Sequence, residues 1–175
     1  MPNDNYRPKV KVKRGIAGLG LFADEDIPRD QLIIEYKGER ISTEEADKRD
    51  NLYLFTVTKK LVIDGKGRDN IARYVNHSCK PNAEAEHDQD KDRIYIRARR
   101  KIKAGEEITY DYGKEYFDDI IKPKGCRCAY CQDKKKRRKK ADKKKRTKST
   151  VSSRRPKSKT RRARKHQRRA SVRSR

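Results

Sequence analysis

Four cysteines are the side chains with the clearest chemistry. Cys126, Cys128 and Cys131 stand within six residues of one another, and Cys79 lies 47 residues upstream. Disulfide bonds among cysteines so close in sequence cannot link distant parts of a large fold. Structural zinc, in contrast, takes four ligands in a tetrahedron. We therefore favour zinc over four unmetallated thiols. A shared zinc ion requires the chain around Cys79 to lie against the 126–131 segment.

Aromatic side chains just before the cysteine cluster form a second group. Tyr110 and Tyr112 are two residues apart, so on a strand they point to the same face, and Tyr116 and Phe117 follow closely. These rings could line a narrow channel that has hydroxyl groups at its end. Ordinary strand packing would use the same residues, because Tyr and Phe favour sheets. The residues alone leave both interpretations open.

Two short motifs could hold a ligand. In Gly18-Leu19-Gly20 the glycines let the backbone approach another molecule, although a tight β-turn is the better explanation of this motif taken alone. The motif lacks the full dinucleotide fingerprint and no helix pattern follows it, which argues against a Rossmann-type cradle. The Asn76-His77-Ser78-Cys79 string offers an amide, an imidazole and a thiol for polar contacts, but a single histidine is more often structural.

Short strands must position these groups. Alternating or continuous apolar runs predict strands at residues 9–13, 32–36, 53–58, 61–63 and 93–97. A capping-box pattern beginning at Ser42 predicts one short helix across 43–50, and a further helical turn is expected within 69–75. Many brief strands with few helices indicate a mostly β domain with short helical inserts.

The charge of the chain is concentrated at one end. The 175 residues carry a net charge of +25, and residues 132–175 hold 24 of the 51 basic residues with only two acidic ones. This segment lacks the apolar side chains that a core needs, so we expect it to be disordered when free and to bind a polyanion such as nucleic acid. No apolar run is long enough for a membrane span, and no secretory signal is visible.

In their order, the motifs resemble those of the SET-domain protein lysine N-methyltransferases, with a compact SET domain and a post-SET cysteine cluster. The resemblance covers about residues 8–131. The matching segments are Gly-x-Gly-Leu-Phe-Ala at 18–23, Glu-Tyr-Lys-Gly-Glu at 35–39, Tyr-Leu-Phe at 53–55, Ile-Asp at 63–64, residues 73–82, residues 105–113 and the cysteine cluster. The cluster departs from the family, because its Cys-x-Cys-x2-Cys spacing is two residues tighter than the commoner post-SET spacing.

The resemblance implies the SET β-fold, with the 76–79 turn against the 105–113 segment in a knot-like crossing. It divides the chain into a SET domain (8–113), a post-SET zinc-binding segment (114–131) and a disordered Lys/Arg-rich tail (132–175). S-adenosylmethionine would bind in a pocket made by Gly18, Leu19, Gly20, Arg73, Asn76 and His77. The target lysine would enter from the opposite side through a channel of Tyr53, Tyr110, Tyr112 and Phe117.

The implied activity is methyl transfer from S-adenosylmethionine to a lysine of a histone or histone-like chromosomal protein, with Tyr112 as the catalytic tyrosine beside Tyr53 and Tyr110. A hydroxyl group on residue 110 leaves less room for a methylated nitrogen, so we expect mono- or dimethylation. The tail would carry the enzyme to nucleic acid, in a nucleus or a bacterial nucleoid. The alternative is a non-enzymatic, zinc-stabilised nucleic-acid-binding protein, which would not need Tyr53, Asn76, His77 and Tyr112 together.

Overall fold

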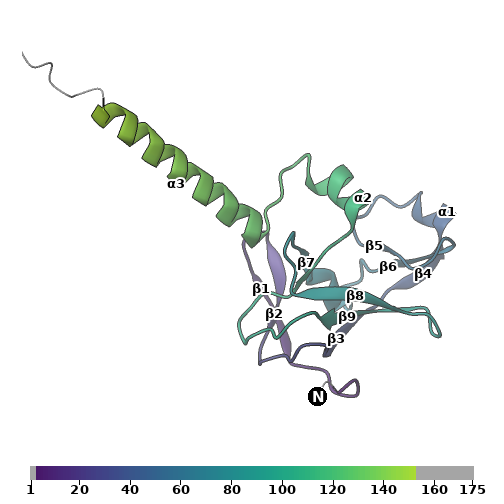
Figure 1. Cartoon of the computed structure of the whole chain (residues 1–175). Coiled ribbons are helices and arrows are strands. Elements are labelled where there is room, and N and C mark those ends of the chain that lie inside the picture. Colours follow the sequence, from purple (N-terminus) through teal and green to yellow (C-terminus); the bar gives the residue numbers. More distant parts are fainter. Residues whose placement is uncertain (1–2, 153–175) are drawn as a thin grey trace, which may run out of the picture. The chain divides into compact units, whose positions relative to one another are not determined.

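Short strands in small sheets dominate the computed structural model, which describes residues 3–152 (Figure 1). Within that range the sheets are β1-β2, β3-β9-β8, β4-β6-β5 and β10-β7. The strands are β1 (Val10–Arg14), β2 (Leu19–Ala23), β3 (Leu32–Tyr36), β4 (Glu39–Ser42), β5 (Leu54–Thr56), β6 (Leu61–Asp64), β7 (Asn76–His77), β8 (Ala83–Asp88), β9 (Arg93–Ala98) and β10 (Thr109–Tyr110). The fold is therefore mostly β with short helical inserts, as the sequence predicts.

The glycine-rich motif forms the hairpin between β1 and β2. Val10 pairs with Ala23 and Arg14 with Leu19, and the turn is closed by a hydrogen bond of 2.6 Å from the Gly15 amide to the Gly18 carbonyl. Gly18 has a φ of +133°, which side-chain-bearing residues rarely adopt. The β-turn interpretation of this motif is thus correct for its backbone.

The described residues form three apolar clusters, of which one contains the residues before β7 and β10. The largest fully buried aliphatic side chains of that cluster are Leu21, Ile27, Ile33, Val75, Ile96, Ile102 and Ile108. Each such side chain stabilises the fold by about 1.5–3 kcal/mol relative to its exposed state. Because Val75 directly precedes β7 and Ile108 directly precedes β10, this core also anchors the two strands that carry candidate site residues.

Strands β7 and β10 join segments that are distant in sequence. They pair in parallel, Asn76 with Thr109 and His77 with Tyr110. The Asn82 side chain locks the pairing, since its Oδ1 accepts from the Thr109 amide (2.8 Å) and its Nδ2 donates to the Glu107 carbonyl (2.9 Å). The predicted meeting of the 76–79 turn with the 105–113 segment is confirmed.

Helices are short and partly as predicted. Helix α1 (Thr43–Ala46) begins at Ser42, whose Oγ accepts from the Glu45 amide at 3.2 Å, and is shorter than the predicted 43–50. Beyond it the backbone bonds span three residues, from Lys48 to Glu45 and from Arg49 to Ala46, which ends the α-helix. The 3₁₀ helix η1 (Ile71–Tyr74) confirms the turn expected within 69–75, whereas α2 (Lys114–Tyr116) and the π-helical η2 (Phe117–Ile121) were not predicted.

The basic segment differs from its prediction. Helix α3 (Ala129–Ser152) runs through the predicted boundary at 131/132, where we expected a chain without structure. The physical reason is that this stretch contains no Gly or Pro and is rich in Lys, Arg and Ala, which favour helix. Within the described range, the chain up to residue 136 and the chain from residue 137 onward form separate units. The predicted disorder of 153–175 lies outside the described residues.

None of the described helices is apolar over a length that would cross a bilayer.

Candidate active site and zinc centre

The Asn76 side chain links the glycine-rich hairpin to the segment just before β10. Its Nδ2 donates to the Leu19 carbonyl at 3.0 Å and to Glu107 Oε1 at 2.8 Å. Gly20 is buried, and a Cβ there would overlap the Glu107 carboxylate and approach Asn76 Nδ2 to 3.0 Å. The structure thus brings together Leu19, Gly20 and Asn76, and it adds Glu107, which the sequence analysis did not single out.

The outer side of the same hairpin is open. No atom lies within 4 Å of the position that a Cβ on Gly18 would occupy, and Leu19 is 54% exposed. Bare backbone beside an amide side chain is a suitable surface for the polar groups of a small ligand. These residues fit the amino-acid or nucleoside part of a cofactor such as S-adenosylmethionine.

His77 lies between the β1–β2 hairpin and the aromatic residues Tyr112 and Phe117. Its side chain is only 6% exposed, and burial lowers its pKa although Asp111 acts in the opposite direction. Nδ1 accepts from the Tyr112 amide at 3.3 Å, which assigns the proton of the neutral ring to Nε2. The Phe117 ring lies 5.3 Å from the imidazole. Phe117 therefore contacts a predicted cofactor residue, and the described ring contacts do not join it to the tyrosines of the predicted channel.

Tyr110 and Tyr112 of the predicted channel pack closely against each other, with their rings tilted. The Tyr110 and Tyr112 ring centroids are 4.8 Å apart, Tyr116 lies 5.1 Å from Tyr112, and Phe55 lies 6.4 Å from Tyr110. Burial raises the pKa of both Tyr110 and Tyr112, so both phenols are protonated at neutral pH. The Tyr112 hydroxyl donates to the Val75 carbonyl at 2.8 Å. Among the described residues the Tyr110 hydroxyl has no hydrogen-bond partner, which leaves it free for a substrate.

Tyr53 and Arg73 form a pair of their own. The guanidinium carbon of Arg73 lies 3.9 Å over the Tyr53 ring, a cation–π contact. Arg73 Nη1 donates to the Lys66 carbonyl, and its Nε is buried without a partner among the described residues. Within the described residues, the Arg73 side chain thus contacts Tyr53, Tyr74 and Lys66. None of these contacts joins it to Gly18–Gly20, with which it was predicted to bind the cofactor.

The four cysteines converge. Their sulfur atoms all lie within 4.8 Å of one another, with 3.8 Å from Cys79 to Cys126 and 3.6 Å from Cys79 to Cys131. Four sulfurs held tetrahedrally at about 2.3 Å from zinc would be about 3.8 Å apart, so the cluster fits that ion. Burial would raise the pKa of Cys128, but amide donors at Cys79 and Cys131 outweigh it and lower that pKa to about 7. The predicted contact of Cys79 with the 126–131 segment is confirmed.

The cysteine cluster adjoins the candidate cofactor site. Cys79 Sγ lies 3.5 Å from His77 Nε2, and Cys79 follows β7 by only two residues. A metal that fixes Cys79 would therefore also fix the His77 imidazole. The cysteine cluster is positioned to stabilise the site as well as the post-SET segment.

The Gly20→Ala substitution tests the close packing of this hairpin. The added methyl group would push Glu107 and Asn76 away from Leu19, so we expect affinity for S-adenosylmethionine to fall about tenfold or more. Isothermal titration calorimetry measures this, with Ala17→Ser on the exposed turn as the matched control. Unchanged affinity in folded Gly20→Ala protein would contradict the arrangement.

Comparison with known proteins identifies the family to which the chain belongs. The SET domain model matches residues 18–113, more than half of the chain and the range that contains both the hairpin and the paired strands β7 and β10. The chain belongs to the SET-domain family. Its fold and its post-SET cysteine cluster agree with that membership.

Similar proteins carry histone methyltransferase names. Histone-lysine N-methyltransferase trr of Drosophila melanogaster is 41% identical over 139 residues, which is 73% of this SET-domain chain and 6% of the fly protein. Histone-lysine N-methyltransferase set-2 of Caenorhabditis elegans is 41% identical over 136 residues, 70% of this chain and 9% of that protein. A Chaetomium globosum protein named histone-lysine N-methyltransferase, H3 lysine-4 specific, is 39% identical over 117 residues, 61% of this chain and 11% of its own length. The SET-domain chain thus spans only a small part of these relatives.

Proposed function

We propose that this SET-domain chain is a protein-lysine N-methyltransferase that uses S-adenosylmethionine and acts on a histone. The observation that carries the proposal is the pairing of β7 with β10, which sets Asn76 beside Thr109 and His77 beside Tyr110, while the His77 ring also accepts a hydrogen bond from the Tyr112 amide. The candidate ligand surface and the aromatic residues are therefore neighbours. The family and the printed names of the relatives support the same activity.

On the cofactor side, the chain supplies bare backbone and two polar side chains. When bound, S-adenosylmethionine provides an electrophilic methyl group next to a positive sulfur. Gly18, Leu19 and Asn76 would hold its polar part, and the His77 and Phe117 rings, whose centroids lie 5.3 Å apart, would contact its base. The position of Arg73 over Tyr53 supports a role for Arg73 in ordering the lysine side of the site.

On the substrate side, the tyrosines make the lysine reactive. Only a neutral amine has a lone pair that can attack, and a lysine loses its proton more readily in a low-polarity channel near another positive charge. Tyr53, Tyr110 and Tyr112 would form that channel. Tyr112, oriented by its bond to the Val75 carbonyl, would direct the amine, and holding the two reactants in line supplies the proximity term.

The number of methyl groups follows from residue 110. The Tyr110 hydroxyl, free of partners within the described residues, would bond the amine or a water molecule and occupy space that a trimethylated nitrogen needs. Mono- and dimethyl-lysine are therefore the proposed products.

Tyr110→Phe is expected to shift the products toward higher methylation. Removal of the hydroxyl opens room for a further methyl group, and we expect the ratio of di- and trimethyl to monomethyl product to rise about tenfold. Mass spectrometry of a histone peptide over a time course provides the ratio. Tyr95→Phe, on the far strand β9, serves as the control, and an unchanged ratio in Tyr110→Phe would refute the assignment.

The proposed substrate residue is lysine 4 of histone H3, because two of the similar proteins carry that specificity in their names. Histone relatives favour chromatin in a nucleus as the site of action and give no support to a bacterial nucleoid. The Lys/Arg-rich segment from residue 132 onward would add sequence-independent contacts to nucleic acid. Zinc on the four cysteines would be structural.

A labelled-methyl assay tests this proposal. The zinc-supplied full chain is incubated with S-adenosylmethionine and either histone H3 or an H3 variant in which arginine replaces the proposed target lysine. Label on H3 that disappears in the arginine variant supports the assignment, and label that persists on another lysine moves the target residue. Nucleic-acid binding without transfer to any basic protein would favour the alternative, a non-enzymatic zinc-stabilised nucleic-acid-binding protein.

A further inference from the structure

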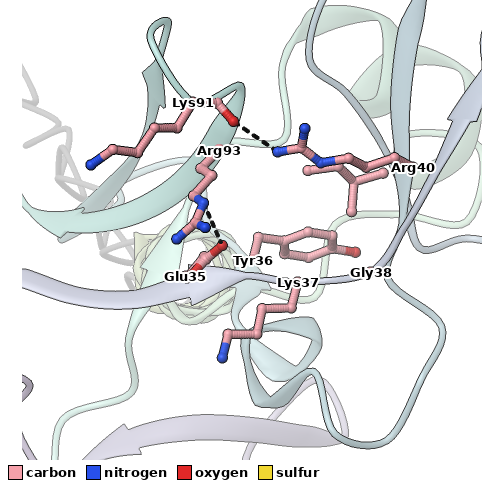
Figure 2. Close-up of a pocket in the computed structure, with 8 residues that line it drawn as sticks. Glu35, Tyr36, Lys37, Gly38, Arg40, Lys91 and Arg93 are labelled. Atoms are coloured by element: carbon pink, nitrogen blue, oxygen red, sulfur yellow. Dashed lines mark hydrogen bonds and ion pairs between the residues drawn. The ribbon is translucent and has the colours of Figure 1, made fainter.

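A basic pocket lies at the junction of two sheets. Its volume is about 390 Å³, and Figure 2 shows the residues that surround it. They come from the end of β3, the turn into β4, β4 itself, β6, and the β8–β9 hairpin. The lining residues are Glu35, Tyr36, Lys37, Gly38, Arg40, Ile63, Lys91 and Arg93. Four of these eight are cationic and one is acidic, so the lining has a net positive charge.

Two of the cations belong to the framework of the pocket. Arg40 Nη2 donates to the carbonyls of Lys91 and Asp92, both at 2.8 Å, so its positive charge is kept because its partners are neutral. Arg93 Nε lies 3.7 Å from Glu35 Oε1, which neutralises part of its charge. Figure 2 shows both interactions at the rim of the hollow.

The two lysines are available for a ligand. In the described part of the chain neither Lys37 nor Lys91 has a carboxylate within 4.0 Å of its ammonium group, and both are exposed. The Lys37 backbone is fixed, because its amide donates to the buried Asn70 Oδ1 at 3.2 Å. The next residue must be glycine, since a Cβ on Gly38 would overlap the Asp64 carbonyl. Lys37 therefore projects from a rigid turn.

Several nearby carboxylates have partners of their own, although the exposed Asp90 precedes Lys91 in the chain. Asp92 bonds His87 at 3.2 Å, and Asp88 Oδ1 accepts the amides of Asp90 (3.2 Å) and Lys91 (3.3 Å). Outside the lining, Glu39 bonds Arg49 at 2.7 Å. These groups weaken the positive field of the pocket but, within the described residues, leave both lysine ammonium groups without an acidic partner.

We propose that this pocket binds phosphate groups of a nucleic-acid backbone. The lining favours a phosphate over an acidic peptide, because its apolar members, Tyr36 and Ile63, are 5% and 4% exposed and offer no surface for a peptide side chain. A forked guanidinium and two ammonium groups on long side chains match the oxygens of successive phosphates. The site belongs to the SET domain, so it is distinct from the basic segment after residue 132 and does not depend on methyl transfer.

Lysine footprinting measures directly, in the full chain, whether a ligand covers the lysines of the pocket. The zinc-supplied protein is acetylated with an amine-reactive reagent alone, with duplex DNA, with inorganic phosphate, or with poly-glutamate, and the rate at each lysine is measured by mass spectrometry. We expect DNA to slow acetylation of Lys37 and Lys91 about fivefold, with little effect on the exposed Lys59 and Lys60 of the β5–β6 turn. Equal protection of all four lysines, or equal protection by phosphate or poly-glutamate, would overturn the proposal.

A pair of double variants gives an independent result. Lys37→Ala/Lys91→Ala and Lys59→Ala/Lys60→Ala remove the same charge from exposed positions. Loss of two phosphate contacts should reduce the slope of log affinity against log salt by about 1.8 for the pocket variant. Identical slopes for the two variants would contradict the proposal.

Discussion

Tyr112→Phe is expected to slow methyl transfer about a hundredfold or more, while S-adenosylmethionine still binds. The hydroxyl group is the only part of the side chain that is removed, so the ring contacts with Tyr110 and Tyr116 persist. What is lost is the bond to the Val75 carbonyl and, by our proposal, the group that directs the amine. The fold should survive because the ring continues to pack.

Single-turnover kinetics with a histone H3 peptide measure this effect, and calorimetry measures cofactor affinity in parallel. Tyr95→Phe removes a hydroxyl group of the same kind from β9, outside the candidate site, and should leave the rate unchanged. A folded Tyr112→Phe protein that transfers methyl groups at the original rate would show that Tyr112 only fills space.

Removal of zinc should abolish both cofactor binding and methyl transfer. Without the ion, nothing covalent or metallic ties the three cysteines of 126–131 to Cys79. Cys79 lies 3.5 Å from His77, so its release would also free the imidazole. Structural zinc contributes about 10–16 kcal/mol of apparent binding free energy in small domains, which makes this one of the largest effects that we expect.

Mass spectrometry of the metal content should give one zinc per chain. A chelator should remove both activities, and added zinc should restore them. Cys128→Ser removes the buried ligand and should lose the metal, while Ala129→Ser, at the exposed neighbouring position, should retain it. Full activity in metal-free protein would contradict a role for the cluster in forming the site.

Local patterns in the sequence predicted much of the framework. Alternating side chains at 93–97 and the apolar run at 32–36 correspond to β9 and β3, because pleated strands with one buried face require that period. The four-cysteine cluster was predictable, since only Cys79 remained to complete a set of four for the expected zinc. The approach of the 76–79 turn to the 126–131 segment then followed from the shared metal.

Other parts of the site depend on tertiary contacts that no local pattern encodes. Arg73 lies one turn before Asn76, and only the packing of η1 decides that its side chain stacks on Tyr53. Glu107 resembles a solvent-exposed acidic residue beside Glu106. A signal for its role exists, because it alternates with the buried Ile108 and faces small glycines across the hairpin, but that contact joins residues about 90 positions apart.

In the basic segment, the sequence pattern did not predict a local element that the structure contains. Its charge predicted a chain without a core, which is correct for its composition, yet helix α3 continues to Ser152. Helix propensity of Lys, Arg and Ala acts without burial, whereas repulsion between like charges weakens the helix, and the sequence alone does not rank the two effects.

Calorimetric titration of the zinc-supplied full chain with S-adenosylmethionine tests the proposed methyltransferase most directly. We expect saturable binding at one site, with a dissociation constant between about 1 μM and 1 mM, in the range usual for enzyme substrates. Folded protein with a full complement of zinc that binds neither S-adenosylmethionine nor its demethylated product at millimolar concentration would contradict it.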